Sequence, residues 1–573
     1  MQLAAFAFDY DGTLARNGRV AEATVDGLRR LKAAGQRLLL LSGRELPDLQ
    51  TAFPAYDIFD AVVAENGGLL LRPALHEERV LGSPPPPALV ASLQQRRIEP
   101  LSVGRSIIAT RQPNEAAVLE AIRECGVEWQ IVFNKGAVMC LPAGVNKASG
   151  LRAALDALEL SPLNVCATGD AENDHAMLAA CGYRAAVANA IDALKANADF
   201  ISRGADGAGV IELIEGFLTD GHGMLTGRVR RHDVRLGQSL EGETVAVPPS
   251  ATVLVVGASG AGKSRLATLL VERILEHGFQ LCLVDPEGDY DRLPQLSALG
   301  DPRTAPSLEE AARLLRRPRN NVALNLLGVA LEERPRCLAR ITKLVEELRV
   351  RSARPHWLLV DEAHHAMPPE VEALPAQRVL PGTILVSASP AALAPGVLAA
   401  TQIVIAVGSD APAMLAGYCK AAGVPAPPRS ERQLRGDEVL CWHRGADCVH
   451  TVRVDAPRLE HQRHIRKYAH GSLGVDKSFH FRGPHGNLNL RAQNLTLFLQ
   501  MAAGVDDDTW LFHLRRGDYA RWFRGSIRDA ELADETAAIE RRFGADAAAS
   551  RAAIHELVSR RYTGPAEGQP RSA

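Results

Sequence analysis

Short apolar runs alternate with stretches of helical periodicity over the first third of the chain. Residues 38–41 are four leucines, typical of a buried strand, and residues 25–34 repeat apolar positions at helical spacing. Strands that alternate with helices in this way indicate a parallel α/β sheet. We expect the pattern to form one domain over residues 1–216.

A second α/β pattern covers residues 233–455. Its buried-type strands are expected at residues 252–256, 281–284, 357–360, 383–386 and 403–407. The polar and basic stretch 217–232 is predicted to link the two domains.

The rest of the chain changes character. Residues 456–562 are predicted to form a small, mainly helical domain with a basic opening. Its helices are expected at residues 488–503, 507–514 and 530–543. The tail 563–573, rich in glycine, proline and serine, is expected to be disordered.

The bulk charge favours no class of partner. The net charge is −2 and the pI is about 6.8, so no global field attracts nucleic acid or membrane. No apolar run is long enough to span a bilayer, and the opening residues lack the features of a signal peptide. Nine scattered cysteines fit a reducing compartment. We therefore expect a cytoplasmic protein with no membrane partner.

One cysteine and histidine group has two interpretations. Cys441, His443, Cys448 and His450 would supply four zinc ligands, but the C-x-H spacing is not usual for zinc. The alternation of residues and the turn at 444–447 favour a β-hairpin. We favour the hairpin.

The first chemical motif follows the first predicted strand. Asp9 and Asp11 stand one residue apart at the end of that strand, where a turn lets both carboxylates face one crevice. One carboxylate can attack phosphorus, and the other can protonate the leaving oxygen and then activate water. Gly12 relaxes the turn, and Thr13 offers a hydroxyl and a backbone N–H to phosphate.

Three further pieces appear in order along the chain. Ser42 and Gly43 end the second strand and bring a hydroxyl and amides to the crevice. Lys147 precedes an apolar helix and can neutralise phosphate charge. A later strand ends in carboxylates suited to a hard, oxygen-ligated cation, with Asp170, Asn173 and Asp174 in that segment.

This set of motifs resembles the haloacid dehalogenase superfamily, in its class IIB, sugar-phosphatase-like branch. The resemblance implies a Rossmann-like domain with an inserted α+β cap at about residues 71–142, after the sequence Glu65-Asn66-Gly67-Gly68. It implies an Asp9 nucleophile and an Asp11 general acid and base. Phosphate would be held by Thr13, Ser42, Gly43, Lys147 and Asn173, with Lys147 also counted as catalytic. Mg²⁺ would be bound by Asp9, the Asp11 backbone carbonyl, Asp170 and Asp174.

A phosphate-binding loop opens the second α/β domain. An apolar strand, a glycine-rich loop and a helix succeed one another, which is the context that makes this motif specific. The predicted nucleotide-binding residues are Gly257, Ala258, Ser259, Gly260, Ala261, Gly262, Lys263, Ser264 and Arg265. Lys263 would reach the β- and γ-phosphates of ATP, and Ser264 would bind its Mg²⁺.

A carboxylate pair follows the predicted strand 357–360. Asp361 would hold Mg²⁺, and Glu362 would orient the attacking water. The domain resembles the HerA/FtsK-like ring ATPases, with Asp285 after the second strand and 387–389 as a sensor-like segment. The resemblance implies a RecA-like P-loop fold and a homo-oligomeric ring. Too little α/β sequence remains for the second lobe of a helicase, and the usual β-barrel ahead of such motors is absent or reduced.

Two basic features remain open. Arg351 and Arg354 are either arginine fingers across a subunit boundary or solvated surface. Residues 456–525 combine a cluster of basic residues with aromatic residues, which would bind nucleic acid by stacking, or else form an ordinary helical domain with an aromatic core. The basic residues are His461, Arg463, His464, Arg466 and Lys467, and the aromatic residues are Phe479, Phe481, Trp510, Trp522 and Phe523. We favour the ordinary domain.

Together these patterns predict a bifunctional enzyme. Its phosphatase would hydrolyse a small phosphomonoester, such as a sugar phosphate, phosphoglycolate or a nucleotide. Its ATPase would regulate or assemble the protein. The alternative is a nucleic-acid end-processing or DNA-translocating ATPase whose phosphatase acts on DNA or RNA ends or on nucleotides.

Overall fold

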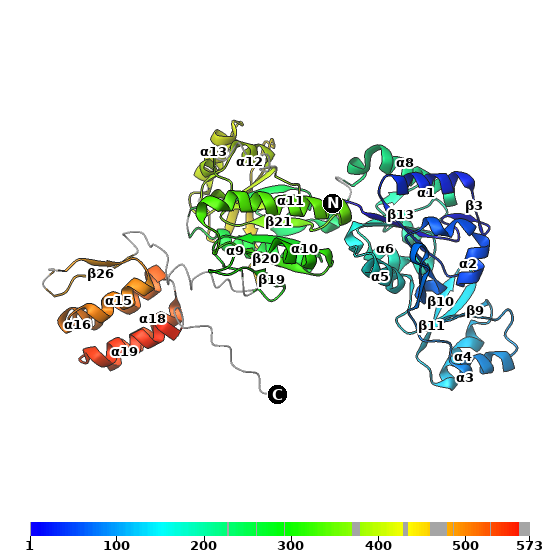
Figure 1. The fold of residues 1–573 in the computed structure, drawn as a ribbon, viewed down its shortest axis with the longest axis horizontal. Helices are drawn as coiled ribbons and strands as arrows, with labels where there is room; N and C mark the ends of the chain where they lie inside the picture. The colour runs from blue at the N-terminus through cyan, green and yellow to red at the C-terminus, as the bar shows by residue number, and fades with distance from the viewer. Residues whose placement is uncertain are drawn as a thin grey trace. The chain divides into compact units, whose positions relative to one another are not determined.

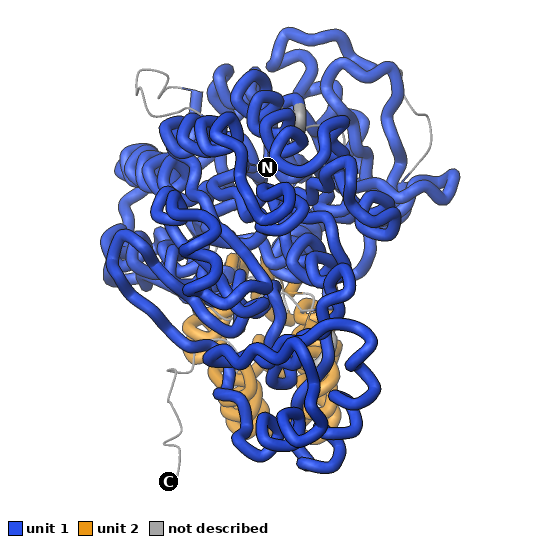
Figure 2. Tube along the Cα trace, turned by 90° about the vertical axis from the view of Figure 1, so that its right-hand side faces the viewer, with its two compact units in different colours: residues 1–458 blue, residues 459–573 orange. Residues whose placement is uncertain are grey.

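The computed structural model falls into two compact units, residues 1–458 and 459–573 (Figure 2). The structure describes residues 2–225, 229–258, 260–290, 293–369, 379–427, 434–458, 478–484, 486, 488–527 and 529–560. Among these residues, no helix combines the length and the apolar character that a membrane crossing requires. Each unit is taken by itself below.

The first unit begins with an eight-stranded sheet in the order β14-β13-β12-β1-β4-β5-β6-β7. The strands are β1 Ala5–Asp9, β4 Arg37–Leu41, β5 Ala61–Ala64, β6 Leu69–Arg72, β7 Glu77–Val80, β12 Val165–Gly169, β13 Tyr183–Ala186 and β14 Phe200–Ile201. The strands from β14 to β5 run parallel, and β6 and β7 add an antiparallel edge. Strand β1 lies at the point where the chain order reverses between β4 and β12, and ligands bind at such switch points.

Helices cover this sheet, and a small hairpin accompanies it (Figure 1). They are α1 Glu22–Ala33, α2 Leu46–Ala52, α5 Lys147–Ala157, α6 His175–Ala180, α7 Asp192–Lys195 and α8 Asp206–Leu225, with the hairpin β2 Ala15–Arg16 and β3 Arg19–Val20. Helix α1 packs on α8, and α5 packs on α6. The parallel α/β architecture predicted for this segment is therefore confirmed.

A separate four-stranded sheet with two helices forms the cap. Its elements are α3 Pro87–Gln95, β8 Ser102–Val103, β9 Ile108–Arg111, α4 Glu115–Cys125, β10 Trp129–Asn134 and β11 Ala137–Pro142. The expected cap start near residue 71 is wrong. The leucines of β6 are buried in the main core, and β6 pairs with β5, so the main sheet continues through β7.

The second sheet of the first unit has eleven strands in the order β16-β15-β25-β24-β23-β17-β22-β21-β18-β20-β19. Its strands are β15 Val234–Ser239, β16 Thr244–Val247, β17 Thr252–Val256, β18 Leu281–Asp285, β19 Leu296–Leu299, β20 Asn321–Asn325, β21 Trp357–Val360, β22 Thr383–Ser387, β23 Ile403–Val407, β24 Glu438–His443 and β25 His450–Val454. The five predicted strands all lie within one residue of their expected bounds. Strands β15 and β16 join the edge of this sheet through β25.

Both faces of the second sheet are covered by helices. Those helices are α9 Lys263–Glu276, α10 Leu308–Arg316, α11 Arg334–Ser352, α12 Pro395–Ala400 and α13 Ala411–Ala422. Along β17, Val253 and Val255 belong to the core under α9, whereas Leu254 and Val256 belong to the core under α10 to α13. Successive side chains of a strand point to opposite faces, so an all-apolar strand is one buried on both sides.

The cysteine hairpin is confirmed. Strand β24 pairs with β25 antiparallel, and Cys441 is 1% exposed within the sheet core. Among the described residues, the group of side chains close enough together to hold a metal ion is Asp9, Asp170 and Asp174, and the hairpin residues form no such group. The zinc interpretation is therefore wrong.

The predicted linker 217–232 is wrong over much of its length. Helix α8 extends to Leu225, with a break in its helical geometry at Asp220, and its buried face carries Val210, Leu213 and Ile214. The short helix η6 Arg230–His232 then packs on the phosphatase-like sheet. Arg231 Nη2 donates to Asp199 Oδ2 and to Gly182 O, both at 2.7 Å.

The two sheets of the first unit meet where β12 and β21 begin. His356 directly precedes β21, and its Nε2 lies 2.9 Å from Oδ1 of Asn164, which directly precedes β12. Arg354 is 1% exposed in the same junction, where it donates to Gln280 Oε1 and Arg316 O, each at 2.9 Å. Arg354 is thus a buried structural residue, and the arginine-finger interpretation is wrong for it. Arg351 is exposed.

The second unit has a hairpin and a helical bundle. Its elements are β26 Phe479–Phe481, β27 Leu490–Ala492, α15 Leu495–Gly504, α16 Asp507–Arg515, α17 Asp518–Trp522, the π-helical turn η11 Phe523–Ile527, α18 Ala530–Arg542 and α19 Ala547–Val558. The helix expected to begin at residue 488 begins at Leu495, because residues 490–492 pair with β26 and the Asn494 side chain caps α15.

The aromatic residues of the second unit form its core. Phe481 and Phe523 are fully buried, and Phe479 and Trp522 are 6% and 7% exposed. Trp510 is fully buried, and its Nε1 donates to Ser550 Oγ. These rings cannot stack on nucleic-acid bases without unfolding the unit. The predicted basic cluster at residues 461–467 lies outside the described residues.

We expect the junction to weaken at acidic pH. Burial, and then Arg354 and Arg349, lower the pKa of His356 well below its ordinary value. A histidine with a depressed folded-state pKa contributes stability that is present above pH 6.5 and is lost as the pH falls below it, by up to about 1.4 kcal/mol per pH unit. His356→Gln removes this titration. The drop in melting temperature between pH 7.5 and pH 5.5 should therefore be smaller in His356→Gln than in the wild type.

Exposed His555 supplies the matched control. His555→Gln should keep the wild-type pH dependence, and an equal change in both variants would contradict a role for the buried ring.

Candidate functional site

The predicted phosphatase residues meet at the carboxyl edge of the first sheet. Asp9 is the last residue of β1, Ser42 follows β4, and Asp170 follows β12. Strand β1 pairs in parallel with both β4 and β12, so the three strand ends lie side by side. Residues far apart in sequence are thereby brought to one crevice.

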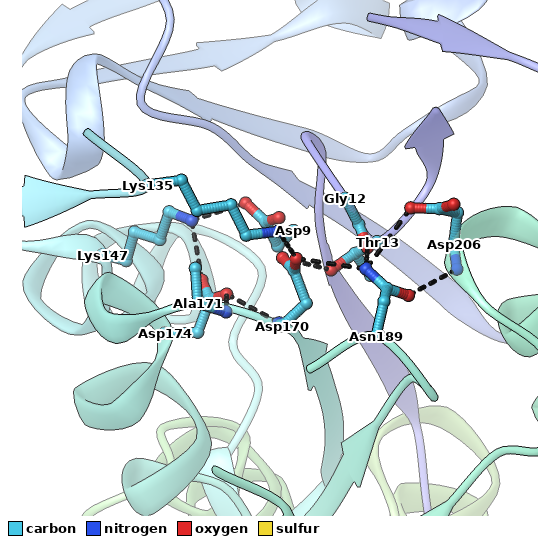
Figure 3. A network of polar contacts seen from close by, with 10 residues as sticks. All are labelled: Asp9, Gly12, Thr13, Lys135, Lys147, Asp170, Ala171, Asp174, Asn189 and Asp206. Carbon is cyan, nitrogen blue, oxygen red and sulfur yellow. Dashed lines mark hydrogen bonds and ion pairs between the residues drawn. The ribbon is translucent and has the colours of Figure 1, made fainter. Parts of the chain in front are cut away.

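Lys147 links the carboxylates of this crevice (Figure 3). It is the first residue of α5, it is fully buried, and its Nζ lies 2.5 Å from Asp9 Oδ1 and 2.6 Å from Asp174 Oδ1. Asp174 Oδ2 accepts the backbone N–H groups of Asp170 and Ala171 at 2.9 and 3.0 Å. Asp174 therefore holds both the lysine and the loop that carries Asp170.

Burial sets the electrostatics of the site. Burial, and then the Asp174 carboxylate, raise the pKa of Asp9 well above its ordinary value. Burial alone would lower the pKa of Lys147, but Asp174 and Asp9 together raise it, so the ammonium stays charged. Burial also raises the pKa of Asp170. Lys147 and the cap residue Lys135, which contacts Asp170, bring two positive charges to three carboxylates, so the site favours a further positive charge.

Asp11 is positioned by an arginine from the end of β4. Arg44 Nε and Nη2 donate to the two Asp11 oxygens at 2.7 and 2.8 Å, and Arg44 Nη1 donates to Asp48 at 2.9 Å. Such a two-bond pair holds a carboxylate in one orientation. The Asp11 side chain stays 37% exposed toward the crevice. Sequence analysis assigned no role to Arg44, whose partner lies thirty-three residues away.

The predicted phosphate-binding residues line the same crevice. Thr13 is fully buried, and its hydroxyl donates to Asp170 Oδ1 at 3.2 Å. Ser42 is fully buried, and its Oγ accepts the Arg44 backbone N–H at 3.1 Å. A side-chain carbon at Gly43 would lie 3.2 Å from the sulfur of Met139 in the cap, so this glycine lets the cap approach closely.

Two polar residues of the site, Asn189 and Lys135, were not among the residues predicted from the sequence. Asn189 Nδ2 donates to Gly12 O at 2.7 Å and lies 3.4 Å from Asp170 Oδ2 (Figure 3). It follows β13, and its place after a parallel strand was the signal that could have revealed it. Lys135 from the cap contacts Asp170 Oδ2. Nothing in the local sequence of Lys135 indicates this contact.

The cap is tied to the main sheet by Glu65. Its carboxylate accepts the backbone N–H groups of Arg105 at 3.1 Å and Ser106 at 2.6 Å. Glu65 and Asn66 both have left-handed backbones, with φ of 52° and 51°, and such strain is usual at functional sites. Asn66 Oδ1 accepts from Asn173 Nδ2 at 2.9 Å, so the same turn reaches the phosphatase motif after β12.

The donor set fits a divalent cation. Asp9, Asp170 and Asp174 each offer a buried carboxylate oxygen, and these oxygens lie within 4.8 Å of one another. Hard oxygen ligands are those that Mg²⁺ prefers. Asn173 Oδ1 is buried without a protein partner among the described residues, so it too can accept a ligand.

The phosphate-binding loop connects β17 to α9. Gly260 and Gly262 have φ of 80° and 103°, which residues with a side chain rarely adopt, and a side chain at Gly257 would lie 2.6 Å from Val407 O. Lys263 Nζ donates to Gly257 O at 2.9 Å, and Arg265 is exposed. Ser259 lies outside the described residues.

Two features of this loop suit a nucleotide with its metal. The Ser264 hydroxyl is buried without a protein partner among the described residues, as expected of a metal ligand. The N-terminus of the fourteen-residue helix α9 offers backbone N–H groups to phosphate.

The predicted carboxylate pair lies after β21. Asp361 is 2% exposed, and its Oδ2 accepts from the Tyr290 hydroxyl at 3.1 Å. Tyr290 is held in turn by Asp285, whose carboxylate accepts the N–H groups of Gly288 and Tyr290 at 2.8 and 2.9 Å. Burial raises the pKa of Asp285 to about 7. Asp285 therefore organises the loop that positions Asp361.

Glu362 is strained and close to a histidine. Its φ is 41°, in the left-handed region, and its Oε2 lies 3.5 Å from His364 Nδ1. Burial, and then the adjacent His365, lower the pKa of His364 to about 4. The imidazole is therefore neutral at neutral pH and forms no ion pair with Glu362.

Comparison with known proteins identifies both parts. Residues 6–91 and 109–214 match haloacid dehalogenase-like hydrolases, and residues 250–347 match the central domain of the helicase HerA. A phosphoglycolate phosphatase of Methanothermobacter thermautotrophicus is 33% identical over 37% of this chain and 98% of the relative. One of Archaeoglobus fulgidus is 29% identical over 37% of this chain and 95% of the relative.

A solved structure from Thermoplasma acidophilum is 19% identical, covers 38% of this chain and 99% of its own, and has a TM-score of 0.34. The matches to the family models confirm both resemblances drawn from the motifs. Because the Methanothermobacter relative is matched over 98% of its length at 33% identity, this chain belongs to the haloacid dehalogenase-like hydrolases as a phosphatase, and it also carries a HerA-like ATPase domain.

Proposed function

We propose that the N-terminal domain hydrolyses a small phosphomonoester through an aspartyl phosphate on Asp9. One observation carries the proposal. Asp9 and Asp11 stand at the end of β1, with Asp9 held by Lys147 and Asp11 held by Arg44. The site thus contains a buried carboxylate that can attack phosphorus beside a partly exposed carboxyl group that can protonate the leaving oxygen. This reaction needs both groups.

The first step transfers the phosphoryl group to the enzyme. Because Lys147 binds Asp9 Oδ1, we assign the attack to Oδ2, which forms a bond to phosphorus as the ester P–O bond breaks. Asp11 gives its proton to the leaving alkoxide oxygen, and the alcohol departs. Thr13, Ser42, Gly43 and Asn173 would hold the phosphoryl oxygens.

The second step returns the enzyme to its starting state. The Asp11 carboxylate takes a proton from water, and the oxygen of that water attacks phosphorus while the bond to Asp9 breaks. Inorganic phosphate leaves, and Asp9 is again a carboxylate. Arg44 holds Asp11 in place through both proton transfers.

We assign Mg²⁺ to Asp9, Asp170 and the Asp11 backbone carbonyl. Asp174 is assigned a supporting role, since Lys147 and two backbone N–H groups already occupy its oxygens. When bound, the cation would screen the repulsion between the Asp9 carboxylate and the anionic substrate and would keep Asp9 ionised.

The substrate class is a small phosphorylated metabolite. The two relatives described above are named phosphoglycolate phosphatases, which makes phosphoglycolate the first compound to test, ahead of sugar phosphates and nucleotides. The nucleic-acid alternative is weakened, since the aromatic residues that would stack on bases lie in the core of the second unit.

We propose that the second domain binds and hydrolyses ATP and thereby regulates the phosphatase. Lys263 and Ser264 would bind the phosphates and Mg²⁺, Asp361 would support that ion, and Glu362 would orient the attacking water. The junction supports regulation, because the Asn164–His356 contact joins the starts of the strands that carry Asp170 and Asp361. Ring assembly and a cytoplasmic location remain predictions.

The catalytic assignment predicts that two substitutions each lower kcat. Asp9→Asn removes the nucleophile and should lower kcat for a phosphomonoester by about 10³-fold or more. Asp11→Asn keeps the nucleophile but removes the proton carrier, and should lower kcat by about 10²–10⁴-fold. Steady-state release of inorganic phosphate measures both.

Asp48 offers a matched control, because it binds the same Arg44 from an exposed position. Asp48→Asn should retain activity within about fivefold, since exposed ion pairs contribute roughly 0–1 kcal/mol. Full activity in Asp9→Asn would refute the nucleophile.

The regulatory assignment predicts that Lys263→Ala abolishes ATP hydrolysis and makes phosphatase activity insensitive to ATP. The loss follows because Lys263 supplies the positive charge that would meet the β- and γ-phosphates. Phosphate release from a phosphomonoester, measured with and without ATP, tests the second part. Lys343→Ala, an exposed lysine on α11, is the control and should behave as wild type. If ATP alters the variant and the wild type equally, regulation through this site is wrong.

A further inference from the structure

Lys135 stands at the tip of a cap hairpin that reaches the catalytic crevice. Asn134 and Ala137 form the last pair of β10 and β11, so Lys135 and Gly136 make a two-residue turn. Their φ angles are 45° and 85°, as such tight hairpin turns require. The hairpin therefore fixes the backbone from which the lysine side chain extends.

The ammonium of Lys135 lies over the phosphatase motif. Its Nζ contacts Asp170 Oδ2, and a side-chain carbon at Gly12 would lie 2.6 Å from it. Its side chain is 46% exposed, whereas that of Lys147 is fully buried. Lys135 Nζ thus lies beside both Asp170 and the turn at Gly12, which follows Asp11.

The other cations of the crevice are each paired with two carboxylates. Lys147 is shared by Asp9 and Asp174, and Arg44 is shared by Asp11 and Asp48. Among the described cap residues, Lys135 is the cation that pairs with a carboxylate of the site. It also lies on the cap, between β10 and β11, whereas Lys147 and Arg44 belong to the domain of the main sheet.

Asp170 cannot fully serve a divalent cation and Lys135 at the same time. A cation held by Asp170 would displace the ammonium, and the hairpin would keep that ammonium close above the crevice. The displaced charge then needs an anionic partner near the transferred phosphoryl group. Because one oxygen of Asp170 lies within 4.8 Å of one of Asp9, that partner must be only a few bonds from phosphorus.

We propose that Lys135 is a specificity residue that binds an anionic group on the leaving alcohol. The proposal rests on the function proposed above and narrows its substrate class to short phosphomonoesters with a second anion, of which 2-phosphoglycolate is the simplest carboxylate. Sugar monophosphates without a second anion are then poor substrates. A carboxylate and a second phosphate share this chemistry, and the substrates chosen below distinguish them.

The test compares the full chain and its Lys135→Met and Lys135→Arg variants on four substrates in Mg²⁺. They are 2-phosphoglycolate, ethyl phosphate of similar length without the carboxylate, 1,3-propanediol bisphosphate and glucose 6-phosphate. The measured quantity is kcat/KM relative to ethyl phosphate. For Lys135→Met, the preference for 2-phosphoglycolate over ethyl phosphate should fall by about tenfold to a hundredfold, as expected for a lost charged hydrogen bond. Lys135→Arg should retain most of the preference.

Exposed Arg123 on cap helix α4 provides the control. Arg123→Met removes the same charge from the cap and should leave the substrate preference unchanged. The wild type could instead prefer the bisphosphate, and not 2-phosphoglycolate, over ethyl phosphate. If Lys135→Met then loses that preference, the result would support a phosphate as the second anion. Equal losses on charged and neutral substrates would overturn the proposal while the phosphatase function stands. A wild type that hydrolyses none of the four substrates would overturn both.

A binding experiment separates recognition from turnover. In the Asp9→Asn background, isothermal titration calorimetry would measure 2-phosphoglycolate and inorganic phosphate with and without Lys135→Met. The added substitution should weaken 2-phosphoglycolate binding by about tenfold or more and inorganic phosphate binding by much less. Equal weakening of both ligands would place Lys135 at the phosphoryl group and overturn its role in specificity.

Discussion

The phosphatase domain depends on one buried cation among three buried carboxylates. Lys147 contacts Asp9 and Asp174 directly, and Asp174 orders the loop that carries Asp170. Removing the charge of Lys147 would leave the buried Asp9 and Asp174 carboxylates without the cation that they share, which is among the costliest changes in a protein interior. The start of helix α5 controls where this lysine points. Asn146 and Ser149 cap each other's backbone N–H groups and hold Lys147 at the first helical position.

The proposed nucleotide site and the proposed phosphomonoester site are built in the same way, although they lie in different domains. Each places carboxylates at the end of an apolar parallel strand, Asp170 after β12 and Asp361 after β21. Each strand starts at the junction, at Asn164 and His356, so each site lies at the far end of its strand from the contact that joins the domains. The junction is therefore the contact through which the proposed regulation of the phosphatase would act.

The cap and the C-terminal unit show how burial decides between interpretations. Residues 69–72 are apolar enough for either the cap or the main sheet, and pairing with β5 decides for the main sheet. The aromatic residues of the second unit stand among basic residues in the sequence, which suggests a nucleic-acid surface. Among the described residues, the aromatic residues first considered for stacking lie in the core and contact one another, because a small helical unit needs large side chains to form a core; they are Phe479, Phe481, Trp510, Trp522 and Phe523.

The sequence by itself determined the two α/β domains, the strand ends that carry chemistry, and the motif residues Asp9, Asp170, Lys263 and Asp361. These signals are local, since a buried strand, a glycine turn and a helix start each occupy a few consecutive residues. Only the tertiary structure decided that Arg44 holds Asp11, that Lys135 reaches Asp170, and that Arg354 is buried between domains. Arg44 and Asp11 lie 33 positions apart, and Arg354 also donates to Glu159 O, 195 positions away. No local pattern encodes them, because the partner of a charged side chain is chosen by which elements the folded core brings together.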